Sequence, residues 1–271
     1  MQTQIQNQTV EREAGTDVRI LSWNILSEEL TPDAPGIEAR MDGICNTILQ
    51  YLPDAGGIQE ISERAYALFA ERLGDLYEFV NPKTKEGNFS FTGIAYNKRK
   101  YRLLEGDIIN YELGNRRIRI VTWIRLQERE GGEREWILLS THWDRHACNR
   151  CPQAEYMGKL VSGLEQRYGL PVICTGDFNA RESSNAFQIF LRTSGQDDAK
   201  YTCPEPVNNC FTGHDVGVFE PQYEGVESID HITVTKGTRV LHYETVINGE
   251  VVSLSDHFPL YADLKFGPET V

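Results

Sequence analysis

The spacing of hydrophobic residues changes along the chain, and each spacing predicts one kind of element. Apolar residues at three- and four-residue steps over Ile37–Tyr51 predict an amphipathic helix that ends at Pro53-Asp54. Short apolar runs such as Val18–Trp23 and Ala55–Gln59 predict buried strands. Further helices are expected over residues 65–73, 152–168 and 184–193. Further strands are expected over residues 77–80, 91–96, 101–111, 118–126, 136–141, 172–175, 229–235, 240–246 and 259–266, with turns at Gly87-Asn88 and Gly131-Gly132.

Most of these elements are strands, many of them joined by hairpins, with four helices between them and no repeat or linker. In a wholly parallel wound sheet, nearly every strand would be followed by a helix. The order of predicted strands and helices along the chain therefore favours an α/β (α+β) fold in which two packed mixed β-sheets are flanked by helices. We expect one catalytic domain over residues 18–268, preceded by a polar, disordered N-terminal lead-in over residues 1–17.

The charge of the chain restricts its partners. The 271 residues include 27 Lys and Arg against 40 Asp and Glu, a net charge of −13. Binding a long duplex usually requires a basic stripe, so strong duplex DNA binding is not expected. A local basic pocket remains compatible with this charge. The sequence has no apolar run long enough for a transmembrane segment and does not begin like a secretory signal, so we expect a cytoplasmic protein, or a secreted one if a signal peptide has been removed.

Polar residues with metal-binding or acid–base chemistry gather at the ends of the predicted strands. In five places an apolar strand ends in such a cluster, and in a sixth place the cluster opens a strand. The five are Trp23-Asn24, Gln59-Glu60, Thr141-His142-Trp143-Asp144, Gly176-Asp177-Phe178-Asn179 and Ser255-Asp256-His257, and the sixth is Ile229-Asp230-His231. Carboxylates at buried positions are costly unless they accept hydrogen bonds or bind a cation. One hard divalent ion with oxygen ligands would account for several of these clusters together.

Each cluster taken singly has an ordinary structural explanation. Asn24 can be a turn residue, Glu60 can belong to the cap of the following helix, and His142 can be a hydrogen-bonded strand histidine. Asp177-Phe178-Asn179 can form an Asx turn, and Ser255-Asp256-His257 can be a loop before a strand. Taken in this order along the chain, the clusters indicate a single site.

The segments SWNIL, GIQEIS, LSTHWD, CTGDFNA, SIDHITV and SDHFPL resemble the endonuclease/exonuclease/phosphatase (deoxyribonuclease I-like) superfamily. The resemblance extends from about Val18 to Phe266, and its six motifs follow the family order. It implies a four-layer sandwich and the cleavage of a phosphoester with the help of Mg²⁺ or Mn²⁺. The Thr-His-Trp-Asp form at residues 141–144 resembles a bacterial THxD-type subgroup and not the nucleases that act on duplex DNA.

The resemblance also implies a metal site. Glu60 would be the principal metal ligand, and Asn24 and Asp256 would complete the protein part of the coordination shell. The chain departs from the family at Ala55-Gly56-Gly57-Ile58, where an apolar β-branched pair is common. Glycines at this place would loosen the strand or let another backbone approach closely, without removing Glu60.

Five further residues would carry the chemistry that the resemblance implies. Asp177 would orient or deprotonate the attacking water, and Asn179 would fix that water and the phosphate. His257 would contact the scissile phosphate, with Asp230 holding its tautomer. His142 occupies the position of a second phosphate-contacting histidine in some relatives.

The loop after the His142 strand should lie at the mouth of the site. Asp144, Arg145 and Arg150 are candidate substrate-binding residues, since the arginines could bind a second anionic group. The alternative is a solvated loop that caps the next helix. The spacing of Cys148 and Cys151 also suggests zinc together with His142 and His146, but the chain has no second well-spaced pair.

Of the remaining cysteines, Cys45 and Cys174 lie in apolar segments and are expected to be buried thiols. Cys203 and Cys210 bracket a loop and could form a disulfide in an oxidising compartment. We expect free thiols or this disulfide in preference to a zinc site.

The sequence thus favours a metal-dependent phosphodiesterase or phosphatase acting on a small or flexible phosphoester. The first alternative is a single-strand-specific nuclease or 3′-exonuclease, which would need exposed aromatic residues for base stacking. The candidates for stacking are Trp143, Tyr156, Phe211 and Tyr223, each of which can equally serve in packing. A catalytically silent binding module on the same fold would lack a metal ligand or a histidine, and none is missing. The substrate, the preferred metal and the oligomeric state do not follow from the sequence.

Overall fold

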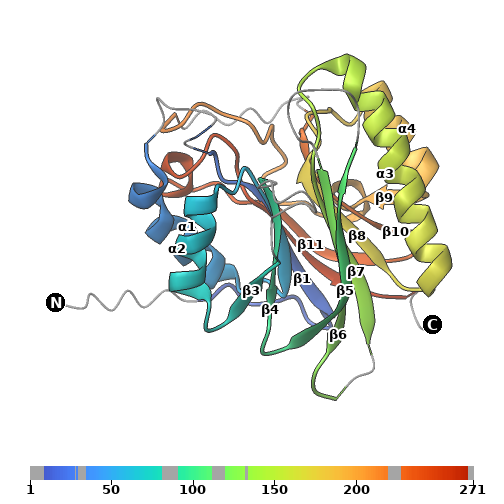
Figure 1. The fold of residues 1–271 in the computed structure, drawn as a ribbon, viewed down its shortest axis with the longest axis horizontal. Coiled ribbons are helices and arrows are strands. Elements are labelled where there is room, and N and C mark those ends of the chain that lie inside the picture. Colours follow the sequence, from blue (N-terminus) through green and yellow to red (C-terminus); the bar gives the residue numbers. More distant parts are fainter. Residues whose placement is uncertain are drawn as a thin grey trace.

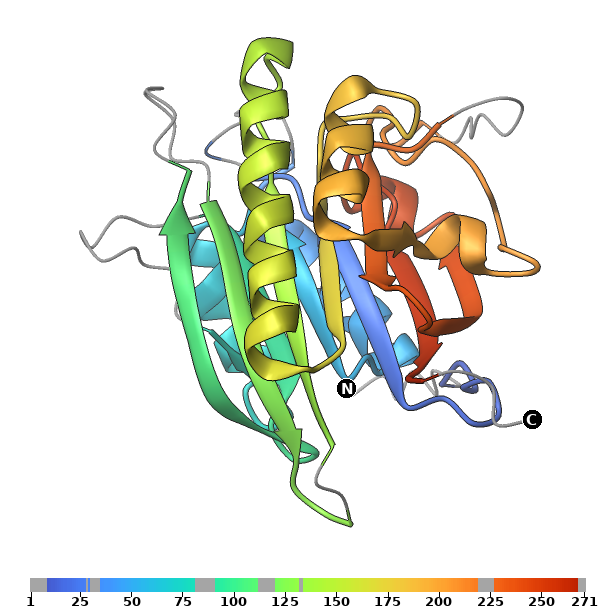
Figure 2. The same ribbon diagram turned by 90° about the vertical axis from the view of Figure 1, so that its right-hand side faces the viewer.

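Two six-stranded sheets pack against each other, and helices cover their outer faces (Figures 1 and 2). The computed structural model describes residues 9–27, 29, 35–80, 91–111, 120–131, 134–218 and 227–267. The expected fold class, two mixed sheets flanked by helices in a four-layer α/β sandwich, is confirmed.

The first sheet contains strands from both ends of the chain. Its strands are β1 (Val18–Asn24), β2 (Ala55–Gln59), β3 (Tyr77–Phe79), β4 (Thr92–Asn97), β11 (Arg239–Thr245) and β12 (Leu260–Lys265). They follow the order β11-β12-β1-β2-β4-β3. Helices α1 (Ile37–Tyr51) and α2 (Glu63–Leu73) lie on its outer face (Figure 1). The apolar residues of the two helices, such as Met41 and Phe69, form one buried cluster with Trp23 and Tyr261 of the sheet.

The second sheet comes from the middle of the chain. Its strands are β5 (Tyr101–Asn110), β6 (Ile120–Glu128), β7 (Glu135–His142), β8 (Val172–Asp177), β9 (Gln196–Asp198) and β10 (Asp230–Thr235). They follow the order β5-β6-β7-β8-β10-β9. Helices α3 (Ala147–Tyr168) and α4 (Asn185–Ser194) cover the outer face (Figure 2). Between the two sheets, residues such as Ile20, Leu138 and Leu260 form a separate core, which holds the sheets together.

Strand direction brings the predicted site residues to one edge of this sandwich. β1 and β2 run in parallel with Asn24 opposite Gln59, and β7 and β8 run in parallel with His142 opposite Asp177. β10 runs antiparallel to β8, so its first residue, Asp230, lies opposite Asp177. β12 is antiparallel to β1, and the residues just before it reach the same edge. The polar ends therefore converge although they are far apart in sequence.

Three parts of the fold differ from the sequence-based expectation. Helix α3 begins at Ala147, five residues before the expected Pro152, which lies inside the helix. Strand β9, the one-turn helix α5 (Ala199–Thr202) and the 3₁₀ helix η1 (Val251–Ser253) were not expected, because elements this short have no periodic pattern of their own. Ser255-Asp256-His257 follows η1 and not a strand. The turn at Gly87-Asn88 and residue Gly132 lie outside the described residues.

Residues 9–17 belong to the segment expected to form the lead-in. The Arg12 guanidinium contacts the Asp54 carboxylate and donates to the Leu52 carbonyl oxygen, and the Glu13 amide donates to Asp263 Oδ2 at 2.9 Å. Arg12 and Glu13 therefore hold this segment against the turn before β2 and against strand β12. The division of the chain into a lead-in and one domain over residues 18–268 stays a prediction.

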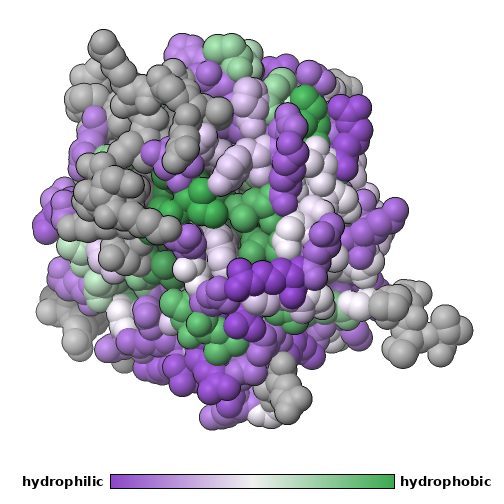
Figure 3. Space-filling view, turned by 45° about the vertical axis from the view of Figure 1, so that its right-hand side comes forward, coloured by the Kyte–Doolittle hydropathy of each residue, from purple (hydrophilic) through white to green (hydrophobic). Residues whose placement is uncertain are grey.

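The surface is mainly polar. On the face in Figure 3, hydrophilic side chains predominate around a smaller central area of hydrophobic ones. The large hydrophobic residues exposed within the described ranges are Leu103, Leu104, Tyr156, Tyr201, Val207 and Val218. Across those ranges, the helices are all too short or too polar to cross a membrane.

Close packing against the facing sheet at Gly57 explains why β2 departs from the family pattern. A Cβ atom at this position would lie 2.1 Å from Thr175 Oγ1 and 2.6 Å from Ser140 Oγ, both on the facing sheet. These distances are shorter than any van der Waals contact, so a side chain would push the sheets apart. The close approach at Gly57 is therefore made by side chains of the facing sheet, and not by another backbone as expected.

We expect Gly57→Ala to lower the free energy of unfolding by about 1–3 kcal/mol, because the added methyl group overpacks the interface between the sheets. Gly163→Ala is the matched control. Gly163 lies in helix α3 with nothing within 4 Å of an added Cβ, so alanine should stabilise the protein by about 0.5–1 kcal/mol. Urea denaturation of the two variants measures both values. An unchanged stability of Gly57→Ala would contradict the packing argument.

Candidate active site

Asp177, the last residue of β8, lies at the centre of the edge where the polar strand ends meet. Its Oδ2 atom lies 3.2 Å from His142 Nε2 and accepts a hydrogen bond from Asn24 Nδ2 at 3.2 Å. His257 Nε2 lies 3.9 Å from the same oxygen. Three of the predicted site residues, taken from β1, β7 and the segment before β12, thus surround one carboxylate oxygen.

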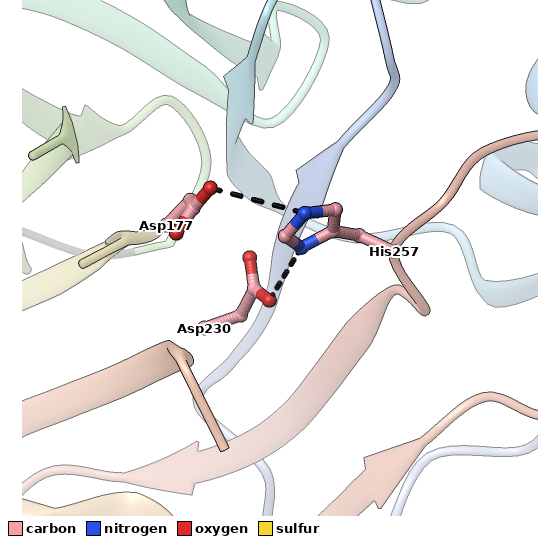
Figure 4. Close-up of side chains that lie close together, drawn as sticks. All are labelled: Asp177, Asp230 and His257. Atoms are coloured by element: carbon pink, nitrogen blue, oxygen red, sulfur yellow. Dashed lines mark hydrogen bonds and ion pairs between the residues drawn. The ribbon is translucent and has the colours of Figure 1, made fainter. Parts of the chain in front are cut away.

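His257 lies between two aspartates (Figure 4). Its Nδ1 atom lies 2.7 Å from Asp230 Oδ2, which also accepts a hydrogen bond from Thr212 Oγ1 at 2.6 Å. Its other ring nitrogen faces Asp177. Because a carboxylate can only accept, the Asp230 contact places a proton on Nδ1. Asp230 therefore holds the ring in one orientation through Nδ1, and its part in the reaction stays a prediction.

The charges of these groups depend on one another. Burial opposes ionisation of Asp177, but His142 and then His257 hold the pKa of its carboxyl well below the usual value. Burial also opposes a charged His257, but Asp230 and then Asp177 raise its pKa well above the usual value. The structure therefore favours a carboxylate at Asp177 and an imidazolium at His257.

Asn24, Glu60 and Asp256 are the three expected metal ligands. Glu60 directly follows β2 and accepts a hydrogen bond from the Ser27 amide at 2.9 Å through Oε2. Its backbone has φ +58°, which turns the chain sharply after the strand. Among the residues that the structure describes, buried Asp256 Oδ1 has no hydrogen-bond partner. Burial raises the pKa of Asp256, and Glu60 and Asp177 raise it further against the opposing effect of His257.

A divalent cation fits this arrangement. A buried carboxylate oxygen without a donor, next to a second carboxylate, is unfavourable unless a positive charge satisfies both. Mg²⁺ and Mn²⁺ take oxygen ligands of this kind. The acidic residues here could therefore bind a metal, and the assignment of Asn24, Glu60 and Asp256 as its ligands stays a prediction.

Two compact groups of His, Asp and Glu could also hold an ion within the described ranges. One consists of Asp177, Asp230 and His257, which form the centre of the site. The other consists of Glu182, Asp198 and His231, of which the sequence analysis named His231 alone, in the sixth polar cluster.

Asn179 is positioned by the turn that follows β8. Its amide donates to Asp177 Oδ1 at 2.8 Å, and its Nδ2 atom donates to the Trp143 carbonyl oxygen at 3.0 Å. Its backbone has φ +47°, a conformation that asparagine adopts more readily than most residues. The Asx turn considered as an alternative is therefore present, and the catalytic role of Asn179 stays a prediction.

The loop after β7 is held mainly by its own contacts. Asp144 Oδ1 accepts from the His146 amide at 2.8 Å, which forms an Asx turn before helix α3, and its Oδ2 accepts from Asn149 Nδ2 at 3.1 Å. The Arg150 guanidinium contacts the carbonyl oxygen of Asn179. Arg145 is exposed. Substrate binding by Asp144, Arg145 and Arg150 stays a prediction, and two of these side chains already have structural partners.

The aromatic residues considered for base stacking occupy different environments. Trp143 is fully buried and donates to the Tyr111 hydroxyl at 3.2 Å, so it serves in packing. Tyr156 is 42% exposed and contacts Tyr111 edge-on. The Arg181 guanidinium lies 5.8 Å from the centre of the Phe211 ring. Tyr223 lies outside the described residues.

The sequence analysis missed Thr212 and His214. Thr212 Oγ1 donates to Asp230, and the His214 amide donates to the Asp256 carbonyl oxygen at 2.7 Å. The His214 ring stacks on Phe258 at 4.1 Å between centroids. Gly213 pairs with His257 as an isolated bridge, which aligns this loop with the site. Both residues lie in an irregular segment, where the hydrophobic residues follow neither the helical spacing nor the strand alternation. No pattern in the sequence therefore marks them.

All six cysteines are free thiols, so Cys203 and Cys210 do not form a disulfide in this structure. Cys148 and Cys151 also belong to neither of the two groups able to hold a metal. Cys148 is exposed and Cys151 half-buried, whereas the other four are buried.

We expect a maleimide reagent at neutral pH to label Cys148 first and Cys151 more slowly. Cys45 and Cys210 should remain unlabelled until the protein unfolds, because burial raises the pKa of these thiols to about 12 and about 11. Mass spectrometry of peptides from native and denatured samples provides the measurement. Rapid native labelling of Cys45 would contradict the packing of helix α1.

Comparisons with known proteins identify the family and support the fold. Residues 21–257 match the model of the Endonuclease/Exonuclease/phosphatase family. An endonuclease/exonuclease/phosphatase from Bacteroides vulgatus has a similar structure, with a TM-score of 0.80, 23% identity and coverage of 92% of this chain and 98% of that one. A mannosyl-6-phosphatase from Bacteroides thetaiotaomicron has a TM-score of 0.76, 20% identity and coverage of 92% and 100%.

Among curated proteins, Protein angel of Drosophila melanogaster is 21% identical over 248 residues, which cover 83% of this chain and 69% of that protein. Bacterial proteins occur among the similar structures, and the assignment to a THxD-type subgroup stays a prediction. The family match spans most of the chain and includes the site residues from Asn24 to His257. The chain therefore belongs to the endonuclease/exonuclease/phosphatase family, whose members are phosphoester hydrolases.

Proposed function

We propose that this protein is a divalent-metal-dependent hydrolase of a small or flexible phosphoester, acting by in-line attack of water. The observation that carries the proposal is the convergence of Asn24, His142 and His257 on the Asp177 carboxylate. The net charge of −13 favours a compact substrate over a long duplex, because a duplex would be repelled by most of the surface. The mannosyl-6-phosphatase named above supports a small phosphoester as substrate.

In this proposal, each residue at the edge has a separate task. Asp177 is buried and ionised, and its carboxylate orients or deprotonates the attacking water. Asn179 is fixed by the turn after β8 and donates to the phosphate through its amide group. His257, charged and oriented by Asp230, stabilises the negative charge that develops on the phosphate oxygens. His142 donates to the phosphate from the end of the neighbouring strand β7, next to the Asp177 carboxylate.

Asn24, Glu60 and Asp256 would hold the metal. The ion, when bound, neutralises charge on the phosphate and polarises the bond to the leaving group. The orphaned Oδ1 atom of Asp256 and the proximity of Glu60 are the features of this chain that support this ligand set.

The proposal is tested with a panel of substrates in Mg²⁺ or Mn²⁺: nucleotides, short single-stranded oligonucleotides, phosphoinositides, sugar phosphates and sphingomyelin. We expect metal-dependent product release from at least one compact phosphoester and weak activity on duplex DNA. Release from single-stranded oligonucleotides alone would favour the nuclease alternative. Inactivity on the whole panel, without metal binding in calorimetry, would favour the silent binding module.

We expect Glu60→Gln to weaken Mn²⁺ binding by about 10–100-fold, because the neutral amide removes one negative charge from the proposed ligand set. Calorimetric titration with Mn²⁺ measures this effect independently of turnover. Glu71→Gln is the matched control, since Glu71 is an exposed residue of helix α2. Equal affinities of the two variants would rule out Glu60 as a ligand.

A further inference from the structure

A second polar cluster lies behind the candidate site, on the opposite face of β10. Successive residues of a strand point to opposite faces, so His231 points away from the face to which Asp230 contributes. The His231 ring is 1% exposed and stacks on Phe187 of helix α4, with 4.0 Å between ring centroids and an interplanar angle of 26°. Three further buried residues, Glu182, Asp198 and Lys200, complete the cluster.

Both ring nitrogens of His231 have defined partners. Nε2 lies 2.9 Å from the carbonyl oxygen of Ala180, which can only accept, so this nitrogen carries a hydrogen. Nδ1 lies 3.4 Å from Asp198 Oδ2. Burial disfavours the charged ring, yet Asp198 and then Glu182 leave the pKa of His231 raised. The ring therefore joins the loop after β8 to a buried carboxylate.

The other members of the cluster hold Asp198 and its neighbourhood in place. Lys200 Nζ lies 2.7 Å from Glu182 Oε1 and donates to Ser228 Oγ at 3.2 Å. Asp198 Oδ1 accepts from the Lys200 amide at 2.9 Å and caps helix α5. Two carboxylates thus face one ammonium and one imidazole ring, and Asp198 Oδ2 and Glu182 Oε2 have no hydrogen-bond partner among the described residues.

The loop that His231 contacts carries two of the candidate catalytic residues. Ala180 directly follows Asn179 and is three residues after Asp177. The carbonyl oxygens of Asn179 and Ala180 are held by Arg150 and His231, respectively. Because Asn179 has a positive φ, its conformation costs free energy and depends on such contacts to persist.

We propose that His231 is a positioning residue for the reaction, and that through the Ala180 carbonyl oxygen it holds Asp177 and Asn179 in their catalytic geometry. The proposal rests on the proposed function only for its effect on turnover. The effect on the loop itself can be measured without any substrate.

A pair of variants separates the hydrogen bond from the packing. His231→Phe keeps an aromatic ring against Phe187 and removes the donor to Ala180. His231→Gln retains a side-chain N–H group that can reach the same carbonyl oxygen. We expect His231→Phe to lower kcat by about 10–100-fold with KM changed less than about 3-fold, and His231→Gln to restore most of the loss.

Hydrogen exchange of the backbone amides in residues 177–182 provides the second measurement. We expect faster exchange there in His231→Phe than in the wild type or in His231→Gln, while the amides of β1 and β12 remain protected. Equal exchange and equal kcat in all three proteins would overturn the proposal. Equal losses in the two variants would also overturn it, since the ring and not the hydrogen bond would then matter. If the wild type hydrolyses nothing but the exchange pattern appears as expected, the proposed function fails and the positioning of the loop stands.

Discussion

Asp177→Asn is expected to lower kcat for phosphoester hydrolysis by about 10³-fold, with little change in KM. Within the described ranges, the Asp177 carboxylate is the one acidic group in contact with Asn24, His142 and His257 together. An amide has nearly the same size but cannot accept a proton from water, and it removes the negative charge that both histidines face. The loss should therefore fall on the chemical step and not on substrate binding.

Steady-state kinetics on the best substrate of the panel measures this effect. Asp75→Asn is the matched control, because Asp75 is exposed in the turn after helix α2 and far in sequence from the strand ends of the site. Asp177→Asn must also retain the wild-type unfolding temperature within a few degrees. A loss of activity can then be assigned to the active site and not to unfolding of the protein. A kcat within about 3-fold of the wild type would exclude Asp177 as the residue that activates water.

Strand ends were the part of the site that could be predicted from the sequence. Asn24 and His142 each end a strand with a clear apolar pattern, and the parallel pairs β1–β2 and β7–β8 align those ends at one edge. The resemblance to the family added the roles of the residues. What the sequence could not supply is the distance between them, since no pattern along the chain gives the 3.2 Å between His142 and Asp177.

The contacts that the sequence could not predict come from irregular segments and from adjacent strand residues. Thr212 lies in a loop with no periodic pattern and reaches Asp230 only through the folded chain. His231 is adjacent to Asp230 in sequence, yet the alternation of the strand gives the two residues separate partners. Lys200 and Asp198 belong to elements of three or four residues, which depend on tertiary packing and not on local propensity.

The loop after β7 shows a further limit of prediction from sequence. Arg150 was selected because arginine often binds phosphate, but its guanidinium contacts the carbonyl oxygen of Asn179. Asp144 accepts two hydrogen bonds from its own loop. A charged residue near a site can thus support the catalytic loop from outside, and only the fold distinguishes this from contact with substrate.

Asp230→Asn is expected to lower kcat by about 10²-fold, because it leaves His257 in place and removes the charge that orients it. Asp230 Oδ2 accepts from both His257 Nδ1 and Thr212 Oγ1, so the amide oxygen of an asparagine can keep both hydrogen bonds while the negative charge is lost. The imidazolium form of His257 is then less favoured, and so is its interaction with the developing charge on phosphate. KM should change less than kcat.

A double-mutant cycle tests whether Asp230 acts through His257. If it does, the double variant Asp230→Asn/His257→Ala should have a kcat within about 3-fold of that of His257→Ala alone. The reason is that His257→Ala already removes the imidazole through which Asp230 acts. Thr212→Val is the matched control: it removes one hydrogen bond from the same oxygen but keeps the charge, so kcat should fall by less than about 10-fold. Additive losses in the double variant would show that Asp230 contributes independently of the histidine.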